Sequence, residues 1–475
     1  MDDFIIKAAG VLPSERQYAW QQMEFYAFIH FTVNTFTDRE WGYGDENPAI
    51  FNPSALNADQ WAETCRAAGM KGLILTCKHH DGFCLWPSRF TGHSVKNSPW
   101  KDGKGDVVRE VSAACRRAGL KFGIYISPWD RHEKTYGDSD VYNRFFMNQL
   151  RELLTGYGEI FCVWFDGACG EGPNGKKQVY DWDGYYKLIR ELQPEAVISV
   201  CGPDVRWCGN EAGHCRKSEW SVVPAQLQNA EKTAEKSQKA DDREFSKLVN
   251  SMDEDLGSRE AIKNATELIW YPAEVNTSIR PGWFYHTAED DKVKTAAELL
   301  KVYYNSVGGN SCFLLNIPPD RRGLIHENDV SVLKSLGYLL NQAFCEDLTA
   351  NAVATASESL DEAHRPNNIL NENTSSFWRP TSGTEKADVE VQLEGEKTFN
   401  IIVLKENIRN SGQHVESFTL EVLQNDCWKR IFEGSVIGYK RICCFNQTSA
   451  GRIRLRITAS RLYPTIEYFG VFYQT

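Results

Sequence analysis

Short apolar runs recur along the N-terminal part of the chain, each followed by polar residues and then by a stretch with helical spacing. The runs cover residues 25–29, 72–76, 122–126, 160–165, 196–200, 268–271 and 312–316. Unbroken apolar runs of this length are typical of strands that are buried on both faces, as in parallel sheets covered by helices. The intervening helical stretches cover residues 55–68, 107–118, 141–155 and 182–192.

Six or seven such strand–helix units favour a (β/α)8-like TIM barrel over an open doubly wound sheet. No G-x-G-x-x-G follows the first run, so a dinucleotide fold receives little support. We assign the barrel to residues 1–346. In such a barrel the carboxyl ends of the strands and the loops after them form the active-site face.

The pattern changes in the C-terminal part, residues 347–475. Apolar and polar residues alternate over 389–393, 418–422 and 452–457. Alternation predicts half-buried antiparallel strands, and several of them in a row predict a β-sandwich. The fold class is therefore α/β plus all-β. No low-complexity linker separates the two parts, so we expect them to pack together.

Charge and composition narrow the class of partner. The net charge is −11 and the pI is about 5.5, which disfavours nucleic acid and anionic membranes as partners and fits a neutral substrate. No apolar run approaches the ~20 residues of a membrane span. The 14 tryptophans are mostly expected in the core, although sugar-binding clefts also use indole rings for stacking.

The cysteines and the N-terminus bear on the compartment. The 14 cysteines include no C-x-x-C pair, and we expect mostly free, buried thiols in a reducing compartment. The start of the chain, Met1–Phe4, has no signal-peptide pattern, which favours the cytoplasm. A secreted chain whose signal had been removed would begin in the same way.

Chemically active residues follow the ends of the predicted barrel strands. They are His30, His79, His80, Trp129, Asp130, Asp166 and Asp204. A carboxylate directly after a buried strand is held rigidly, and Gly167 beside Asp166 lets a ligand approach the backbone. From this position alone, Asp166 is as well explained by a helix-capping turn as by catalysis.

A second carboxylate, Glu211, lies between small residues on the loop after the fifth run. Cleavage of a glycosidic bond needs two carboxyl groups, one on each side of the bond. Glu219 is the rival for the second position. Asp204 fits better as a turn residue beside Arg206.

The pair His79–His80 lies between Cys77 and Cys84, which raises the alternative of a metal site. Adjacent residues at a strand end point in different directions, so hydrogen bonding to sugar hydroxyls is the better interpretation, and we expect neither metal nor cofactor. Neither a G-x-S-x-G elbow nor a P-loop occurs. Residues 222–266 are rich in charged residues and predict a solvated helical insertion, with a substrate lid as the alternative.

Six motifs occur in order along the barrel region. They are His30–Gly42, Lys78–Phe83, Ser127–Asp130, Trp164–Gly167, Gly209–Gly213 and Leu314–Pro319. With these motifs the chain resembles glycoside hydrolase family 29, the retaining α-L-fucosidases. One departure is Pro318, where the family pattern leads us to expect Gly before the second Pro.

The resemblance implies a fucose pocket and a pair of catalytic carboxyl groups. Asp166 matches the nucleophile and Glu211 the acid/base. The residues that the resemblance assigns to sugar binding are His30, Glu40, Trp41, His79, His80, Trp129, Trp164, Glu274 and Trp283. The form Gly-Asn-Glu-Ala-Gly resembles the subgroup that cleaves α-1,3- and α-1,4-linked fucose from branched Lewis-type glycans. Broader specificity for α-1,2, α-1,6 or aryl fucosides is the alternative, and a non-catalytic fucose lectin is the rival from another class.

The C-terminal part resembles a discoidin-like β-sandwich. The likeness rests on Phe377–Trp378, the strand around Val391, Gln413–Val415 and Ile466–Val471. Such modules can bind carbohydrate, but the resemblance favours a structural role that supports the barrel.

Overall fold

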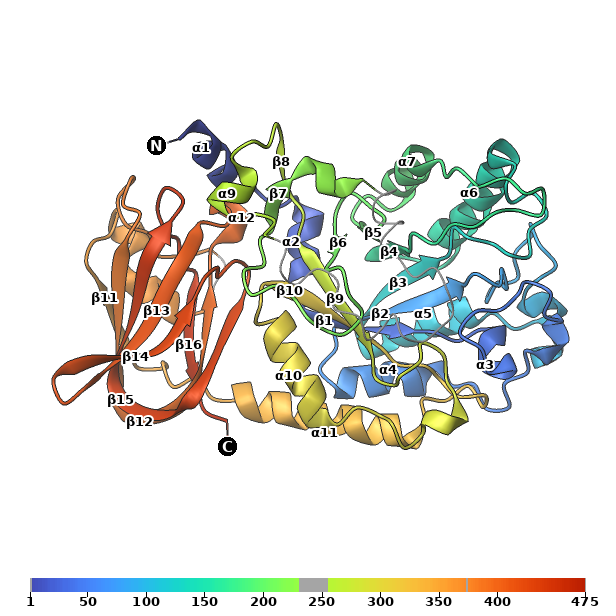
Figure 1. Cartoon of the computed structure of the whole chain (residues 1–475). Coiled ribbons are helices and arrows are strands. Elements are labelled where there is room, and N and C mark those ends of the chain that lie inside the picture. Colours follow the sequence, from blue (N-terminus) through green and yellow to red (C-terminus); the bar gives the residue numbers. More distant parts are fainter. Residues whose placement is uncertain (1, 230–254, 373–374, 475) are drawn as a thin grey trace.

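Eight parallel strands form the centre of the molecule in the computed structural model, which describes residues 2–229, 255–372 and 375–474. Their order is β5-β4-β3-β2-β1-β10-β9-β6. A bridge between Ser199 and Val205 joins the two outermost strands, so the sheet is nearly closed into the expected TIM-like barrel (Figure 1). The barrel strands are β1 (Phe25–Ile29), β2 (Gly72–Lys78), β3 (Lys121–Ile126), β4 (Cys162–Phe165), β5 (Val197–Val200), β6 (Arg206–Trp207), β9 (Ala273–Ser278) and β10 (Ser311–Asn316).

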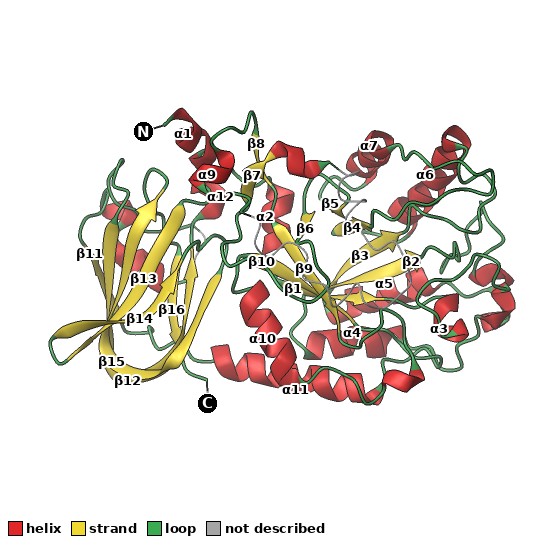
Figure 2. Ribbon diagram, in the orientation of Figure 1, coloured by secondary structure: helices red, strands yellow, loops and turns green. Residues whose placement is uncertain are grey.

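Helices cover the outside of this barrel, as Figure 2 shows. The principal helices are α4 (Ala58–Ala67), α5 (Val107–Ala118), α6 (Ser139–Gly156), α7 (Trp182–Leu192), α10 (Ala296–Ser306) and α11 (Glu327–Phe344). Capping residues in the sequence determine where these helices begin and end. The Asp106 carboxylate caps α5 by accepting the Arg109 N–H at 2.9 Å, and Gly119 ends it with φ 71°.

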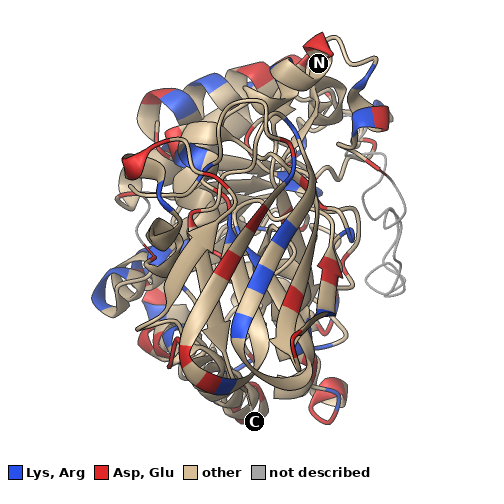
Figure 3. Cartoon of the chain, turned by 90° about the vertical axis from the view of Figure 1, so that its left-hand side faces the viewer, with Lys and Arg blue, Asp and Glu red and all other residues tan. Residues whose placement is uncertain are grey.

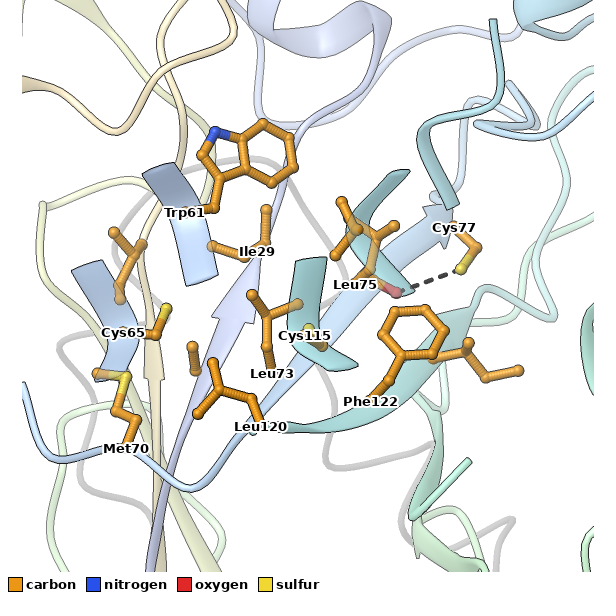
Figure 4. Packing of buried hydrophobic residues seen from close by; sticks show 14 of the residues in the cluster. Ile29, Trp61, Cys65, Met70, Leu73, Leu75, Cys77, Cys115, Leu120 and Phe122 are labelled. Atoms are coloured by element: carbon orange, nitrogen blue, oxygen red, sulfur yellow. Dashed lines mark hydrogen bonds between the residues drawn. The ribbon is translucent and has the colours of Figure 1, made fainter. Parts of the chain in front are cut away.

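The strands bury both faces, which explains why they read as unbroken apolar runs. On β1 the side chains of Phe25, Ala27 and Ile29 pack outward against the helices, whereas Tyr26 and Phe28 point into the barrel. Figure 4 shows the outward layer, where Trp61 and Cys65 of α4 and Cys115 of α5 meet strand residues such as Leu73 and Leu75. Burying each such large side chain contributes roughly 1.5–3 kcal/mol.

Several shorter elements complete this part of the chain. They are α1 (Asp3–Ala9), α2 (Glu15–Gln21), α3 (Val33–Thr37), α9 (Arg259–Ile262), β7 (Val222–Pro224) and β8 (Leu268–Trp270). Trp20 of α2 belongs to the cluster inside the barrel. Among the described helices, none is long and apolar enough to cross a membrane.

Two expectations for this region were wrong. Residues 268–271 are not a barrel strand, because β8 pairs antiparallel with β7 in a separate two-stranded sheet. The segment 222–266 does not begin as a solvated helix, because Val222 and Val223 of β7 are fully buried. Residues 230–254 of the predicted insertion and lid lie outside the described residues.

The C-terminal part is antiparallel, with β11 (Val353–Ala356), β12 (Ala387–Lys405), β13 (Val415–Gln424), β14 (Cys427–Gly434), β15 (Arg441–Ser460), β16 (Tyr468–Phe472) and the short helix α12 (Ile408–Ser411). The long strands β12 and β15 change register between Gln392 and Lys397 and again between Phe399 and Ile401. Before these shifts β12 pairs with β11, and after them it pairs with β16. The two long strands therefore pass through both layers of the expected sandwich.

The barrel and the sandwich share a hydrophobic core. Ile401, Val403, Ile442 and Phe472 of the sandwich belong to the same buried cluster as the barrel helices. Helix α11 ends at Phe344 and β11 begins at Val353, on either side of the predicted boundary at residue 346, which stays a prediction. None of the cysteines, all of which are described, forms a disulfide, and most are buried, as expected.

Candidate active site

A cavity opens at the carboxyl ends of the barrel strands. Nearly all residues that the sequence assigned to catalysis and sugar binding line it: His30, Glu40, Trp41, His79, His80, Trp164, Asp166, Glu211 and Trp283. The cavity is also lined by Phe28, Tyr125, Ala168, Val200, Trp207 and Asn276. Strand parity explains the convergence. His30 continues the inward series of Tyr26 and Phe28, and Asp166 continues that of Cys162 and Trp164.

Asp166 receives hydrogen bonds on both carboxylate oxygens. The Tyr125 hydroxyl donates to Oδ2 at 2.5 Å, and the Ala168 N–H donates to Oδ1 at 3.3 Å. Burial raises the pKa of Asp166 to about 7, and these two donors oppose the rise because they stabilise the ionised form.

Glu211 lies on the loop that follows β6. Gly209 and Gly213 flank it with φ 98° and 81°, a conformation that side chains rarely adopt. Between them Asn210 Oδ1 accepts the N–H groups of Ala212 and His214, at 3.1 and 3.3 Å, which fixes the loop. The sequence therefore holds Glu211 at the cavity through local backbone chemistry.

The carboxyl group of Glu211 differs from that of Asp166 because negative charges lie near it. Burial, with the negative charges of Glu40 and Asp166 acting in the same direction, raises its pKa to about 7. Only the Trp283 indole N–H, which donates to Oε2 at 2.9 Å, acts in the other direction. The two groups differ in the direction of these smaller effects: neighbouring negative charges favour the protonated form of Glu211, whereas two hydrogen-bond donors favour the ionised form of Asp166.

The three imidazoles of the cavity are neutral. Burial lowers the pKa of His30 to about 4 and of His80 to about 3, and it lowers the pKa of His79 well below its ordinary value. His80 Nε2 lies 3.5 Å from Asp166 Oδ2, but this is not an ion pair because the ring carries no charge. Neutral rings offer one donor and one acceptor each.

Hydrogen bonds behind the rings decide which nitrogen carries the proton. His30 Nδ1 donates to Asn316 Oδ1 at 2.8 Å, because the amide nitrogen of Asn316 already donates to Ser278 and to the Trp283 carbonyl. His30 Nε2 is therefore an acceptor. The Asn34 amide donates to His79 Nδ1 at 3.4 Å, which makes His79 Nε2 a donor.

Glu40 joins two loops at the rim. Its carboxylate accepts the N–H groups of Trp283 and Phe284 at 2.8 and 3.1 Å, and His286 Nε2 donates to it at 2.7 Å. His286 Nδ1 lies 2.8 Å from Asp38 Oδ1. This network holds Trp283, and through its indole Glu211, in place.

Two of the predicted sugar-binding residues do not line the cavity. Glu274 is completely buried beneath it, where it accepts hydrogen bonds from Tyr26 Oη at 2.5 Å and from Trp164 Nε1 at 2.7 Å. Its position therefore orients Trp164. Trp129 packs against two of the lining residues, with its ring centroid 5.1 Å from that of His80 and 5.6 Å from that of Trp41.

The rival carboxylate Glu219 is fully buried away from the cavity. It is bonded to Arg206, and Arg216 donates its N–H at 3.0 Å. Arg206 thus pairs with Glu219. Asp204 instead accepts the Ile198 N–H at 2.7 Å and is bonded to Arg190, which fits the predicted structural role of that residue.

The sequence missed Tyr125 and Asn276. Tyr125 was hidden in an apolar run, although its hydroxyl was the only polar side-chain group of residues 122–126. Asn276 accepts the Trp207 indole N–H at 3.1 Å and thereby joins β9 to β6 at the cavity wall.

The chain matches two family models. Residues 8–343 match the alpha-L-fucosidase family and residues 353–467 match the F5/8 type C domain. A putative alpha-L-fucosidase 1 of Oryza sativa subsp. japonica is 42% identical over 97% of this chain and 85% of its own length. Alpha-L-fucosidase 1 of Arabidopsis thaliana is 41% identical over 97% of this chain and 87% of its own length.

Solved structures of other fucosidases are similar to this chain in both sequence and fold. A putative alpha-L-fucosidase from Bacteroides ovatus has a TM-score of 0.85 at 48% identity and covers 99% of this chain and 75% of its own. A Ruminococcus gnavus GH29 fucosidase in complex with fucose has a TM-score of 0.85 at 30% identity, over 98% of this chain and 95% of its own. The chain therefore belongs to the alpha-L-fucosidase family of glycoside hydrolases and is an α-L-fucosidase.

Proposed function

We propose that this enzyme removes terminal α-1,3- and α-1,4-linked fucose from branched Lewis-type glycans, and that it does so with retention of configuration. Asp166 is the nucleophile and Glu211 the acid/base. The observation that carries this proposal is that both carboxyl groups line one cavity in opposite surroundings. Hydrogen-bond donors favour the ionised form of Asp166, whereas neighbouring negative charges favour the protonated form of Glu211.

The reaction proceeds by two displacements. Asp166 attacks the anomeric carbon of fucose, the bond from that carbon to the leaving oxygen breaks, and Glu211 gives its proton to this oxygen. Glu211, now ionised, takes a proton from water. The resulting hydroxide attacks the same carbon, the bond to Asp166 breaks, and free fucose leaves with its original configuration.

The remaining polar groups of the cavity suit a sugar ring. His30 Nε2 accepts and His79 Nε2 donates, so the two imidazoles complement hydroxyl groups of either polarity. Because burial keeps both rings neutral across the working pH range, they bind the substrate without exchanging protons with it. The mechanism requires no metal and no organic cofactor.

The linkage preference rests on the Gly-Asn-Glu-Ala-Gly form of residues 209–213, which resembles the subgroup that cleaves α-1,3- and α-1,4-linked fucose. The experiment compares release of free fucose from a Lewis trisaccharide and from 2'-fucosyllactose. We expect kcat/KM to favour the Lewis trisaccharide by at least about tenfold, which corresponds to roughly 1.4 kcal/mol in the transition state. Equal rates on both glycans would contradict the preference and favour the broad-specificity alternative. Binding without release of fucose from either glycan would favour the lectin.

A further inference from the structure

A second cavity, of about 480 Å³, lies where the barrel meets the sandwich. Its walls come from residues 214–217 after the Glu211 loop, from α10 and the turn after it, and from β14 and β15. Figure 1 shows α10 facing the sandwich, and the Ile442 N–H donates to the Gly308 carbonyl at 3.0 Å across this junction. The second cavity, here called the junction cleft, shares no lining residue with the catalytic cavity.

The lining of the junction cleft is cationic. Its charged residues are Arg216, Lys217, Lys301 and Arg441, and the lining also includes His214 but no Asp or Glu. A cavity lined by charges of one sign is notable in a chain whose net charge is −11. Low-dielectric walls focus such a field, so the cleft attracts anions.

The cations differ in how far their charge is already balanced. Arg216 pairs with the buried Glu219, and its charge is therefore offset. Lys217 and Lys301 are exposed, and within the described residues neither has an ion-pair partner. Arg441 Nε is buried and has no hydrogen-bond partner in the described part of the chain, although another of its nitrogens donates to the Lys217 carbonyl at 3.3 Å.

Arginines elsewhere on the sandwich are arranged differently. Figure 3 shows a band of basic residues on one strand between acidic bands on its neighbours. There Arg452 pairs with Glu390, Arg454 with Glu421 and Arg456 with Asp388. This sheet face is self-neutralised, in contrast to the junction cleft.

We propose that the junction cleft is a binding site for the oxyanion group, sulfate or carboxylate, of an acidic glycan. Guanidinium and ammonium groups are the usual partners of such oxyanions, and the cleft is lined by Lys217, Lys301 and Arg441. The cavity volume is within the range of about 300–1,000 Å³ that is typical of small-molecule sites. The negative charge of the chain as a whole opposes a nucleic acid, whose many phosphates need an extended basic face.

An acidic glycan could reach the junction cleft in two ways, and both would present the same oxyanion. It is either a further branch of the substrate whose fucose occupies the catalytic cavity, or a separate glycan. The first source is favoured because one short loop contributes to both cavities: Glu211 lines the catalytic cavity and His214 lines the cleft, and Asn210 bonds to Ala212 and His214. The experiment distinguishes the two sources.

The test uses the full chain saturated with fucose, so that the catalytic cavity is filled. Binding of N-acetyllactosamine 6-sulfate, neutral N-acetyllactosamine and inorganic sulfate is measured by calorimetry at low salt, where charge interactions are least screened. The variant is Lys217→Glu with Lys301→Glu. The matched control is Lys187→Glu with Lys334→Glu, which makes the same charge change at exposed helix positions away from the cleft.

We expect the sulfated disaccharide to bind the unaltered enzyme and to bind the cleft variant about tenfold more weakly, with little change in the control. Activity on a neutral aryl fucoside should be unchanged in both variants, which shows that they are folded. No binding to the unaltered enzyme, or an equal loss in the control, would overturn the proposal. Inorganic sulfate binding as tightly as the disaccharide would overturn the assignment to a glycan.

A second comparison identifies the source. The ratio of kcat/KM for a sulfated Lewis trisaccharide to that for the neutral one is measured in both variants. A fall in this ratio confined to the cleft variant places the anion on the substrate. An unchanged ratio, together with the loss of disaccharide binding, assigns the cleft to a separate glycan.

Discussion

At the scale of single residues, the two carboxyl groups of the catalytic cavity differ in what surrounds them. Burial raises the pKa of both Asp166 and Glu211 to about 7. Two donors oppose this rise at Asp166, whereas at Glu211 one donor opposes it and the charges of Glu40 and Asp166 add to it. The proposed mechanism needs one proton on the pair, so we expect activity to follow a narrow bell-shaped pH profile centred near pH 7.

Replacing Tyr125 by Phe should move the acidic limb of that profile. The Tyr125 hydroxyl lowers the pKa of Asp166, so its removal raises this pKa and the nucleophile becomes protonated at a higher pH. We expect the acidic limb of kcat/KM to move up by about one pH unit, which is about a tenfold loss on that limb. Tyr142→Phe is the control, because its hydroxyl donates to the Pro128 carbonyl outside the cavity. An unchanged acidic limb in Tyr125→Phe would contradict the role given to this hydroxyl.

Replacing Trp283 by Phe should move the opposite limb. The indole N–H lowers the pKa of Glu211, so without it the acid stays protonated to a higher pH. We expect the alkaline limb to rise by about half a unit to one unit while the acidic limb stays in place. Trp207→Phe serves as the comparison, since that indole donates to Asn276 and not to Glu211. A shift of the acidic limb instead would reverse the roles of the two carboxyl groups.

At the scale of elements, the segment after β6 separates two glutamates with different functions. Glu211 faces the cavity, whereas Glu219 is buried with Arg206 and Arg216 and helps to anchor the segment. Removing one member of a buried ion pair leaves the other without compensation, which costs roughly 3–5 kcal/mol.

Two variants of this segment should therefore fail in different ways. Glu211→Ala should retain its stability and lose far more activity on natural glycans than on aryl fucosides, because good leaving groups need no proton. Glu219→Gln should unfold at a lower urea concentration, with about 3 kcal/mol less stability, and should keep the wild-type ratio of the two activities. Urea titrations and the two-substrate assay measure both effects. A glycan-specific loss in Glu219→Gln would make Glu219 the acid.

The strands also show what the sequence could and could not predict. Strands β1 to β5 and β10 were predicted because they are apolar on both faces. Strand β9 was missed because Glu274 and Asn276 face the barrel interior, which makes its sequence alternate like a half-buried strand. The apolar run at 268–271 was mistaken for it, and β6 is too short to show any periodicity.

The site residues also divide into those that the sequence could predict and those that it could not. The inward parity of β1 and β4 puts His30 and Asp166 at the cavity, and this can be deduced once the strands are known. The partners that set their protonation, Tyr125 and Asn316, come from other strands, so their contacts depend on the barrel register. The same register places Glu274 beneath the cavity and not on its wall.

At the scale of the whole molecule, a buried charge cluster joins the barrel to the sandwich. Glu24, just before β1, lies 3.1 Å from Lys440 of the sandwich, whose Nζ donates to both carboxylate oxygens. Burial raises the pKa of Glu24, but the charges of Lys440, Lys71 and Lys405 outweigh this and lower it to about 2. The sandwich thus contributes directly to the stability of the barrel, consistent with the structural role suggested by its resemblance.

This cluster predicts how stability depends on pH. The folded pKa of Glu24 is below its ordinary value of 4.5, so its contribution is fully present above about pH 4.5 and is lost as the pH falls toward 2. The shift corresponds to about 3 kcal/mol. We expect Glu24→Gln to lose about this much at pH 7 and to approach the unaltered enzyme in stability near pH 2, as measured by urea titration across pH. Glu159→Gln, at an exposed glutamate, is the control. A loss independent of pH would show that packing, not charge, joins the two parts.

The central claim is that Asp166 forms a covalent bond to fucose, and chemical rescue tests it most directly. In Asp166→Gly the nucleophile is gone and azide can occupy its place, on the face of the sugar opposite the leaving group. The measurement follows an aryl fucoside with and without azide and determines the configuration of the product. We predict a nearly inactive variant that azide restores, with β-fucosyl azide as the product. Hydrolysis by Asp166→Gly at the rate of the unaltered enzyme, or rescue that yields α-fucosyl azide, would contradict the account.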